Sequence, residues 1–181
     1  LVGGLVQFVD DANEMAPAFS ITVNDGALNS NMLPATINYT SVNDAPLVNA
    51  ASLTLNEGET VTLSAANFTV TDPDNASFTY IVSGLAGGYF QLTTAAGTPV
   101  TTFTTADLVG GVVQFVDDGD EVAPAFSVTV SDGALNSNTL AATINYTPVN
   151  DAPVVNAASL TLNEGETVTL SAANFTVTDP D

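Results

Sequence analysis

Apolar and polar residues alternate with a period of two along most of this 181-residue chain. In residues 126–131, Phe and Val alternate with Ser and Thr, and residues 140–147 follow the same pattern. Such alternation is typical of strands with one face in a core and one face in water. Asp-Gly turns at 25–26 and 132–133 separate runs of this kind. About seven strands are expected in each stretch of 107 residues, which is the period of the sequence described below. The pattern therefore predicts an all-β fold, an antiparallel β-sandwich.

The apolar positions of these runs predict the core, because residues that alternate in phase share one face of a strand. We expect the core to contain Phe78, Tyr80, Leu92, Phe115, Phe126, Val128, Val130, Leu140, Ile144 and Tyr146. The sequence shows no sustained helical pattern, and only a single turn of helix is expected at 64–67 or 105–109.

Most of the chain occurs twice in the sequence. Residues 1–74 align with residues 108–181 without a gap, and 64 of the 74 positions are identical. The fixed period is therefore 107 residues, which is a common size for one domain. A period of this length predicts a tandem array of β-sandwich domains. One difference, Ala12 in place of Gly119, suggests that this position does not require positive φ.

The repeat divides the chain into three parts. These are the C-terminal part of a preceding repeat (1–44), a complete β-sandwich repeat (45–151) and the N-terminal part of a following repeat (152–181). The sequence Val-Asn-Asp-Ala-Pro marks each boundary, at 42–46 and at 149–153. Its proline fixes φ and favours extended backbone in the preceding residue, so we interpret it as the joint between domains.

The charge composition excludes several classes of function. The chain has 20 Asp and Glu residues but no Lys, Arg, His or Cys. Without a basic side chain it has no group that binds phosphate, so we expect no nucleic acid and no anionic membrane surface as a partner. The absence of Cys excludes disulfides and thiol chemistry. No apolar run approaches the roughly 18 residues of a membrane span, so we expect no membrane insertion.

The acidic residues gather around the two joints, where no side chain can neutralise them. Only water, backbone N–H groups or a bound cation can compensate these carboxylates. Calcium takes six to eight oxygen ligands with flexible spacing, whereas zinc and copper prefer His and Cys. The sequence therefore favours Ca²⁺, with carboxylates that are only solvated as the alternative.

Six short motifs follow one another within one period. They are Leu-Thr-Leu-Asn-Glu-Gly-Glu (53–59), Asp-Pro-Asp (72–74), Phe-Thr-Thr-Ala-Asp-Leu (103–108), Asp-Gly (118–119), Ser-Asp-Gly (131–133) and Asn-Asp-Ala-Pro (150–153). In this order they resemble the cadherin-like repeats of chondroitin sulfate proteoglycans and the extender repeats of very large bacterial surface adhesins. The resemblance covers the whole chain, and it implies calcium between successive domains.

The resemblance implies one calcium site at each joint. The site near residue 150 would use Glu57, Glu59, Asp118 or Asp120, Asn150, Asp151, Asp179 and Asp181. The site near residue 44 would use Asp11, Asn43, Asp44, Asp72 and Asp74.

These features favour a structural function. We expect a calcium-stiffened extender or stalk repeat of an extracellular or cell-surface fibrous protein or adhesin, assembled end to end as a filament. Its partners would be neighbouring repeats of the same chain or protein, and other domains would bind any surface receptor or glycan. The alternative is a carbohydrate- or protein-binding adhesion module, although the chain has no Trp and only four Tyr. We expect no enzyme, because the acidic residues recur with the repeat whereas catalysis needs one site.

Overall fold

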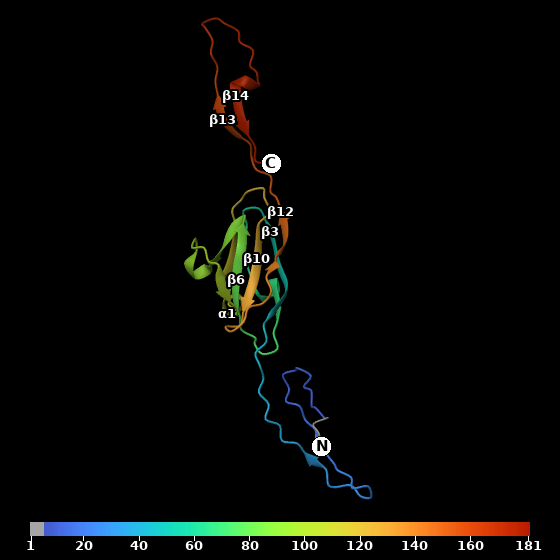
Figure 1. Ribbon diagram of the computed structural model, residues 1–181. Helices are drawn as coiled ribbons and strands as arrows, with labels where there is room; N and C mark the ends of the chain where they lie inside the picture. Colours follow the sequence, from blue (N-terminus) through green and yellow to red (C-terminus); the bar gives the residue numbers. More distant parts are fainter. Residues whose placement is uncertain (1–5) are drawn as a thin grey trace.

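The computed structural model describes residues 6–181, and residues 1–5 of the predicted first segment lie outside the described residues. Figure 1 shows three parts in chain order along an elongated molecule: an extended segment, a β-sandwich and an extended hairpin. The sandwich runs from Leu47 to Thr147, within the predicted complete repeat. The division into tandem repeats stays a prediction.

The sandwich has a four-stranded sheet on one side, in the order β11-β10-β6-β8. These strands are β6 (Thr79–Ala86), β8 (Thr102–Thr104), β10 (Ala125–Ser131) and β11 (Leu140–Ala141). Two three-stranded sheets, β12-β3-β5 and β4-β9-β7, pack against it. Their strands are β3 (Leu47–Asn56), β4 (Thr60–Thr62), β5 (Phe68–Thr71), β7 (Gly88–Leu92), β9 (Val113–Asp117) and β12 (Thr143–Thr147). The prediction of an all-β sandwich is confirmed.

Short helical turns occupy both positions at which the sequence predicted them. These are the 3₁₀ turn η1 (Ala65–Asn67) and the helix α1 (Thr105–Val109), and a second 3₁₀ turn, η2 (Thr93–Ala95), was not predicted. Thr104 caps α1 by accepting a hydrogen bond from the amide of Asp107. The Asp107 carboxylate in turn accepts from the Thr104 amide at 2.8 Å, so the helix begins with a reciprocal cap.

The first and last strands of the unit run in the same direction. Residues 143–147 of β12 pair in parallel with residues 52–56 of β3, whereas the other described strand pairs are antiparallel. The antiparallel pattern predicted from the sequence did not include this pair. Because the two strands are parallel, the chain enters the sandwich at one end and leaves it at the other (Figure 1).

The core lies between the layers and contains a chain of aromatic rings. Phe90 lies 5.0 Å from Phe126 and 5.2 Å from Phe115 between ring centroids, both in edge-to-face geometry. Of the residues predicted for the core, the buried ones are Tyr80, Phe115, Phe126, Val128 and Val130. The partly buried ones, which pack against the core, are Phe78, Leu92, Leu140, Ile144 and Tyr146.

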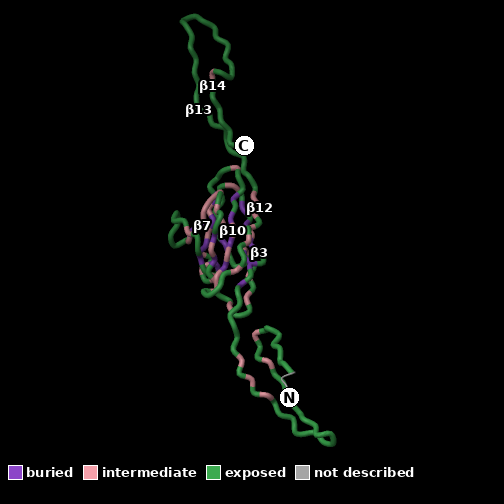
Figure 2. Tube along the Cα trace, in the orientation of Figure 1, coloured by how far each residue is buried: buried purple, intermediate pink, exposed green. Residues whose placement is uncertain are grey.

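The two flanking segments have little packing of their own. They contain β1 (Ser20–Ile21), β2 (Leu33–Pro34), β13 (Val154–Ala158), η3 (Ala172–Asn174) and β14 (Phe175–Thr178). Figure 2 shows them almost entirely exposed, whereas buried residues are confined to the sandwich. Phe8 is 61% exposed, yet Phe115, its equivalent one period later, is 0% exposed. Nearly identical sequence is thus buried only where the rest of the unit covers it.

Candidate metal centre at the joints

Four carboxylates meet where the sandwich joins the following hairpin. They are Glu57 after β3, Glu121 in the loop between β9 and β10, Asp151 in the linker after β12, and Asp181 after β14. Carboxylate oxygens of Glu57, Glu121 and Asp151 lie within 4.8 Å of one another. Asp181 is held beside them, because its Oδ2 accepts a hydrogen bond from the Asp151 amide at 2.7 Å. The cluster thus joins the sandwich to the segment that follows it.

The same arrangement occurs one period earlier. Glu14, Asp44 and Asp74 form a second group with carboxylate oxygens within 4.8 Å, and each lies 107 positions before a member of the first cluster. The Asp44 amide also donates to Asp74 Oδ2 at 2.7 Å, as the Asp151 amide does to Asp181. The structure therefore shows one type of site twice, and the first lacks only the equivalent of Glu57.

Asp117, at the end of β9, positions both loops of the later site. Its side chain is 6% exposed, and Oδ2 accepts hydrogen bonds from the amides of Gly58 at 2.8 Å and Gly119 at 3.1 Å. Gly119 has φ of 75° and its equivalent, Ala12, has φ of 58°. Our expectation that this position does not need positive φ was therefore wrong. Ala12 adopts the left-handed conformation because the loop requires it, at a cost of roughly 1–2 kcal/mol.

Tyr146 fixes the loop that carries Glu121 from the other side. Its hydroxyl donates to the Asp120 carbonyl at 2.5 Å, and Tyr39 makes the equivalent bond to the Asn13 carbonyl at 2.7 Å. Desolvation and the neighbouring carboxylates, Glu57 foremost, raise the pKa of Tyr146 to about 12. The phenol therefore stays protonated and acts as a hydrogen-bond donor throughout the physiological pH range.

The cluster strongly disfavours full ionisation. A side-chain hydrogen bond to Asp181, partial desolvation and the negative charge of Glu57 raise the pKa of Glu121 to about 7. Desolvation and the neighbouring Asp74 raise the pKa of Glu14 in the equivalent cluster. Like charges converge at both clusters, and the chain contains no cationic side chain to offset them.

Without metal, the later joint is expected to become more stable as the pH falls below 7. The pKa of Glu121 is about 7 in the folded form against an ordinary value of 4.5, so the folded form binds this proton more tightly. The stabilisation is complete below 4.5 and is lost as the pH rises through 7. Melting temperatures measured in chelator at pH 8, 6 and 5 should therefore increase in that order. In the Glu121→Gln variant, the melting temperature should depend less on pH. A native chain whose melting temperature does not change over this pH range would contradict the raised pKa of Glu121.

Three buried carboxylate oxygens in the described residues have no hydrogen-bond partner: Asp72 Oδ2, Asp117 Oδ1 and Glu121 Oε1. All three belong to joints or to the loops that form them. An unpartnered buried oxygen is costly, and most such groups in proteins find a donor, a water or an ion. Of the three, Glu121 belongs to a carboxylate cluster, where a bound cation would give its oxygen a partner. The donors are all oxygens, which fits Ca²⁺ and does not fit zinc or copper.

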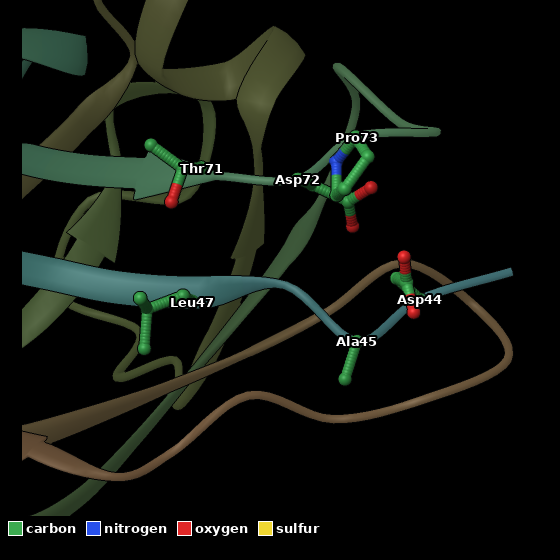
Figure 3. Close-up of a pocket in the computed structure, with 6 residues that line it drawn as sticks. All are labelled: Asp44, Ala45, Leu47, Thr71, Asp72 and Pro73. Atoms are coloured by element: carbon green, nitrogen blue, oxygen red, sulfur yellow. The ribbon is translucent and has the colours of Figure 1, made fainter. Parts of the chain in front are cut away.

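The earlier joint also contains an open pocket of about 510 Å³. Figure 3 shows the carboxylates of Asp44 and Asp72 facing each other at this pocket. Asp72 Oδ1 accepts hydrogen bonds from the amides of Asp74 and Asn75, both at 2.8 Å. The backbone therefore holds this carboxylate in place and leaves Oδ2 available for a cation.

The structure brings together part of the predicted site residues. Those at or beside a cluster are Glu57, Asp151, Asp181, Asp44, Asp72 and Asp74. Four others accept hydrogen bonds from N–H groups of nearby residues instead. These are Glu59 from the Asn56 amide, Asp11 from the Asn13 side chain, Asp118 from the Asp120 amide and Asp120 from the Val122 amide. Asp179 lies exposed after β14.

The two linker asparagines bind neighbouring polar groups. Asn43 Nδ2 donates to Asp132 Oδ2 at 2.8 Å, and Asn43 Oδ1 accepts from Asn75 at 3.0 Å. Asn150 Nδ2 donates to the Asp151 carbonyl at 2.6 Å. Asn43 thus uses its side chain to connect the linker to the β10–β11 turn of the sandwich.

Sequence reasoning missed Glu14 and Glu121 as members of the clusters. The signal was present in the repeat, because Glu occupies this position in both copies whereas Asp120 corresponds to Asn13. Glu121 adjoins the predicted Asp120, and only the loop geometry shows which of the two faces the joint.

The sandwich and its acidic joints define the class of protein. The family model described as cadherin-like matches residues 46–146, more than half of the chain. The chain therefore belongs to the cadherin-like family, as the resemblance in its motifs indicated.

Two curated relatives are large proteins of which this chain spans a small part. It is 29% identical over 144 residues to extracellular matrix protein 3 of Lytechinus variegatus, covering 75% of this chain and 4% of that protein. It is 34% identical over 126 residues to human chondroitin sulfate proteoglycan 4, covering 67% of this chain and 5% of that protein. No solved structure matches significantly.

Proposed function

We propose that this chain is a structural extender repeat of an extracellular or cell-surface fibre or adhesin, stiffened by calcium at its joints. The observation that carries the proposal is the cluster of Glu57, Glu121, Asp151 and Asp181. It combines carboxylates of the sandwich with carboxylates of the linker and of the following segment. A cation bound there contacts both sides of the joint at once.

The architecture of the sandwich suits a linear array of units. The parallel β3–β12 pair places the entrance and the exit of the sandwich at opposite ends, so that successive units extend a line. The linker between Thr147 and Val154 is short, which leaves the joint as the point of bending. A cation that binds the carboxylates on both sides would fix the angle between units, whereas their mutual repulsion would open it.

The names of the relatives support an extracellular location and a structural function. The two relatives bear the names of a matrix protein and a proteoglycan, and neither name is that of an enzyme. Within residues 6–181, no helix is long and apolar enough to cross a membrane. The tyrosines at core-facing positions are buried or donate to loop carbonyls, which disfavours a carbohydrate-binding surface.

The direct test is calcium binding by the whole chain in isothermal titration calorimetry. Glu121→Gln is expected to weaken binding at the later joint by at least tenfold, since even groups that only orient a ligand contribute about 10- to 100-fold. Asp118→Asn is the matched control, because it removes a nearby carboxylate outside the cluster. Magnesium should bind poorly, as it requires a tight octahedron. Equal affinities for the two variants would contradict the proposed site.

A further inference from the structure

The β10–β11 loop, residues 132–139, contacts the linker that enters the sandwich, residues 43–46. Asp132 is the first residue of this loop, directly after β10. Its Oδ1 accepts hydrogen bonds from the amides of Ala134 at 2.6 Å and Leu135 at 2.7 Å. Such bonds from an Asp side chain to its own turn hold the side chain in place. The turn therefore fixes the carboxylate and leaves Oδ2 for the linker.

The linker residue Asn43 binds this second oxygen. Its Nδ2 donates to Asp132 Oδ2 at 2.8 Å, and its Oδ1 accepts from Asn75 Nδ2 at 3.0 Å. Because a carboxylate only accepts, it determines which end of the Asn43 amide faces it. This hydrogen bond, followed by those from the Leu135 and Ala134 amides, lowers the pKa of Asp132 below its ordinary value. Both polar ends of the Asn43 side chain are thus bound by the sandwich.

The same loop holds the chain a second time, at the start of β3. Asn138 Oδ1 accepts from the Val48 amide at 3.0 Å, and Asn138 Nδ2 donates to the Val48 carbonyl at 3.1 Å. Pro46, between the two contacts, is buried, as is Val48. Figure 3 shows the segment that contains Asp44 and Ala45 leading from the linker into β3. The loop therefore holds the chain on both sides of this segment.

We propose that the β10–β11 loop is a clamp that orders the incoming linker on the sandwich without a cation, with Asp132 as its positioning residue. All of its contacts are hydrogen bonds between groups of the chain, so the clamp goes beyond the proposed calcium site and does not depend on it. The clamp uses Asn43 to hold the linker, whereas the resemblance in the motifs implied that Asn43 is a calcium ligand.

The clamp determines where the earlier joint bends. On the other side of this joint, the Tyr39 hydroxyl donates to the Asn13 carbonyl at 2.7 Å, in the loop that contains Glu14. In the described structure, the side chains of residues 40–42, between Tyr39 and Asn43, make no hydrogen bond. Bending of the joint, which belongs to the proposed function, is therefore expected at residues 40–42 and not at residues 43–46.

Nitrogen-15 relaxation of the whole chain in chelator tests the clamp. The amides of residues 43–45 are expected to have order parameters of about 0.85, as in rigid backbone, and those of residues 41–42 should fall below about 0.6. Asp132→Asn keeps the turn, because the remaining side-chain oxygen still accepts from the turn amides, but it presents an amide donor to Asn43 Nδ2. In this variant, the order parameters of residues 43–45 should also fall below about 0.6. Values unchanged from the native chain would overturn the proposal.

Asp25→Asn is the matched control. Asp25 lies 107 positions before Asp132 and forms the same turn, since its Oδ1 accepts from the amides of Ala27 and Leu28, both at 2.9 Å. Within the described residues, no linker side chain donates to this carboxylate. The control should leave the order parameters of residues 43–45 at their native values. A decrease as large as that caused by Asp132→Asn would show a general effect of lost charge and would contradict the clamp.

Exchanging the two groups separates a specific hydrogen bond from a general effect on the fold. In the double variant Asn43→Asp with Asp132→Asn, the amide introduced at position 132 can donate to the carboxylate introduced at position 43. Asn75 also still finds an acceptor there, and the net charge of the chain is unchanged. The order parameters of residues 43–45 should return to about 0.85. A linker as mobile as in the single variant Asp132→Asn would count against the clamp.

The same measurement in millimolar calcium separates the clamp from the calcium hypothesis. If Asn43 were a calcium ligand and not part of a clamp, residues 43–45 would be mobile in chelator and would become ordered in calcium. This result, in the native chain and in Asp132→Asn alike, would overturn the clamp. Ordered residues 43–45 in chelator, with no amide changed by calcium, would support the clamp and contradict the calcium site.

Discussion

Removing calcium with a chelator is expected to lower the melting temperature of the sandwich by about 10–20 °C. A ligand present at 100 times its dissociation constant stabilises the folded form by about 2.7 kcal/mol. For a domain of 60–100 residues, each kcal/mol shifts the melting temperature by about 4–8 °C. The effect arises because Glu57 and Glu121 both belong to the sandwich, so an ion bound at the joint stabilises the folded unit itself. Differential scanning calorimetry at constant ionic strength measures it.

The control for this prediction is the double variant Glu121→Gln with Asp181→Asn. It removes two carboxylates of the later cluster, and the amide oxygen introduced at position 181 can still accept the hydrogen bond from the Asp151 amide. The variant should melt at nearly the same temperature in calcium and in chelator. If the native chain were also unaffected by chelation, its acidic residues would be merely solvated and the calcium hypothesis would fail.

Phe115→Ala is expected to destabilise the sandwich by about 3–5 kcal/mol. Phe115 is fully buried, and its ring packs against those of Phe90 and Phe126. Folded domains are stable by only about 5–15 kcal/mol in total, so this loss is a large share of the free energy of unfolding. The variant is therefore expected to melt far below the melting temperature of the native chain. Urea denaturation followed by circular dichroism measures the change.

Phe8→Ala is the matched control, since it is the same substitution one period earlier. Phe8 is 61% exposed and contacts Phe19, so its removal should cost less than about 1 kcal/mol in the monomer. Equal losses for the two substitutions would mean that the first segment is as well packed as the sandwich, against the structure described above.

The sequence predicted the sandwich well where strands are long and half-buried. Alternation identified β10 and the core positions Phe126, Val128 and Val130, because each strand places every second residue on one face. It did not identify Phe103 and Leu108, which are buried in a three-residue strand and a one-turn helix. Such short elements offer too few residues for a periodic pattern, and their burial depends on the strands that enclose them.

Part of the residues of the candidate site could be predicted from the sequence. The abundance of carboxylates at the joints indicated an oxygen-only cation site, and Glu57, Asp151 and Asp181 do lie together. The choice of Asp118 and Asp120 over Glu121 failed to find the clustered residue, because the left-handed Gly119 turn sets which side chain faces the joint. Local spacing does not contain that information.

Burial itself was the least predictable feature. Nearly identical segments are covered in one position and exposed in the other, so burial here depends on partner strands rather than on the segment's own sequence.

Small-angle X-ray scattering of the whole chain in millimolar calcium and then in chelator, at equal ionic strength, tests the stiffening of the joints most directly. At concentrations where sedimentation shows a monomer, a rigid, elongated particle is expected in calcium. In chelator, the repelling carboxylates should open the joints, and the scattering should become that of a flexible chain around a folded sandwich. Identical scattering profiles in the two conditions would contradict calcium-stiffened joints.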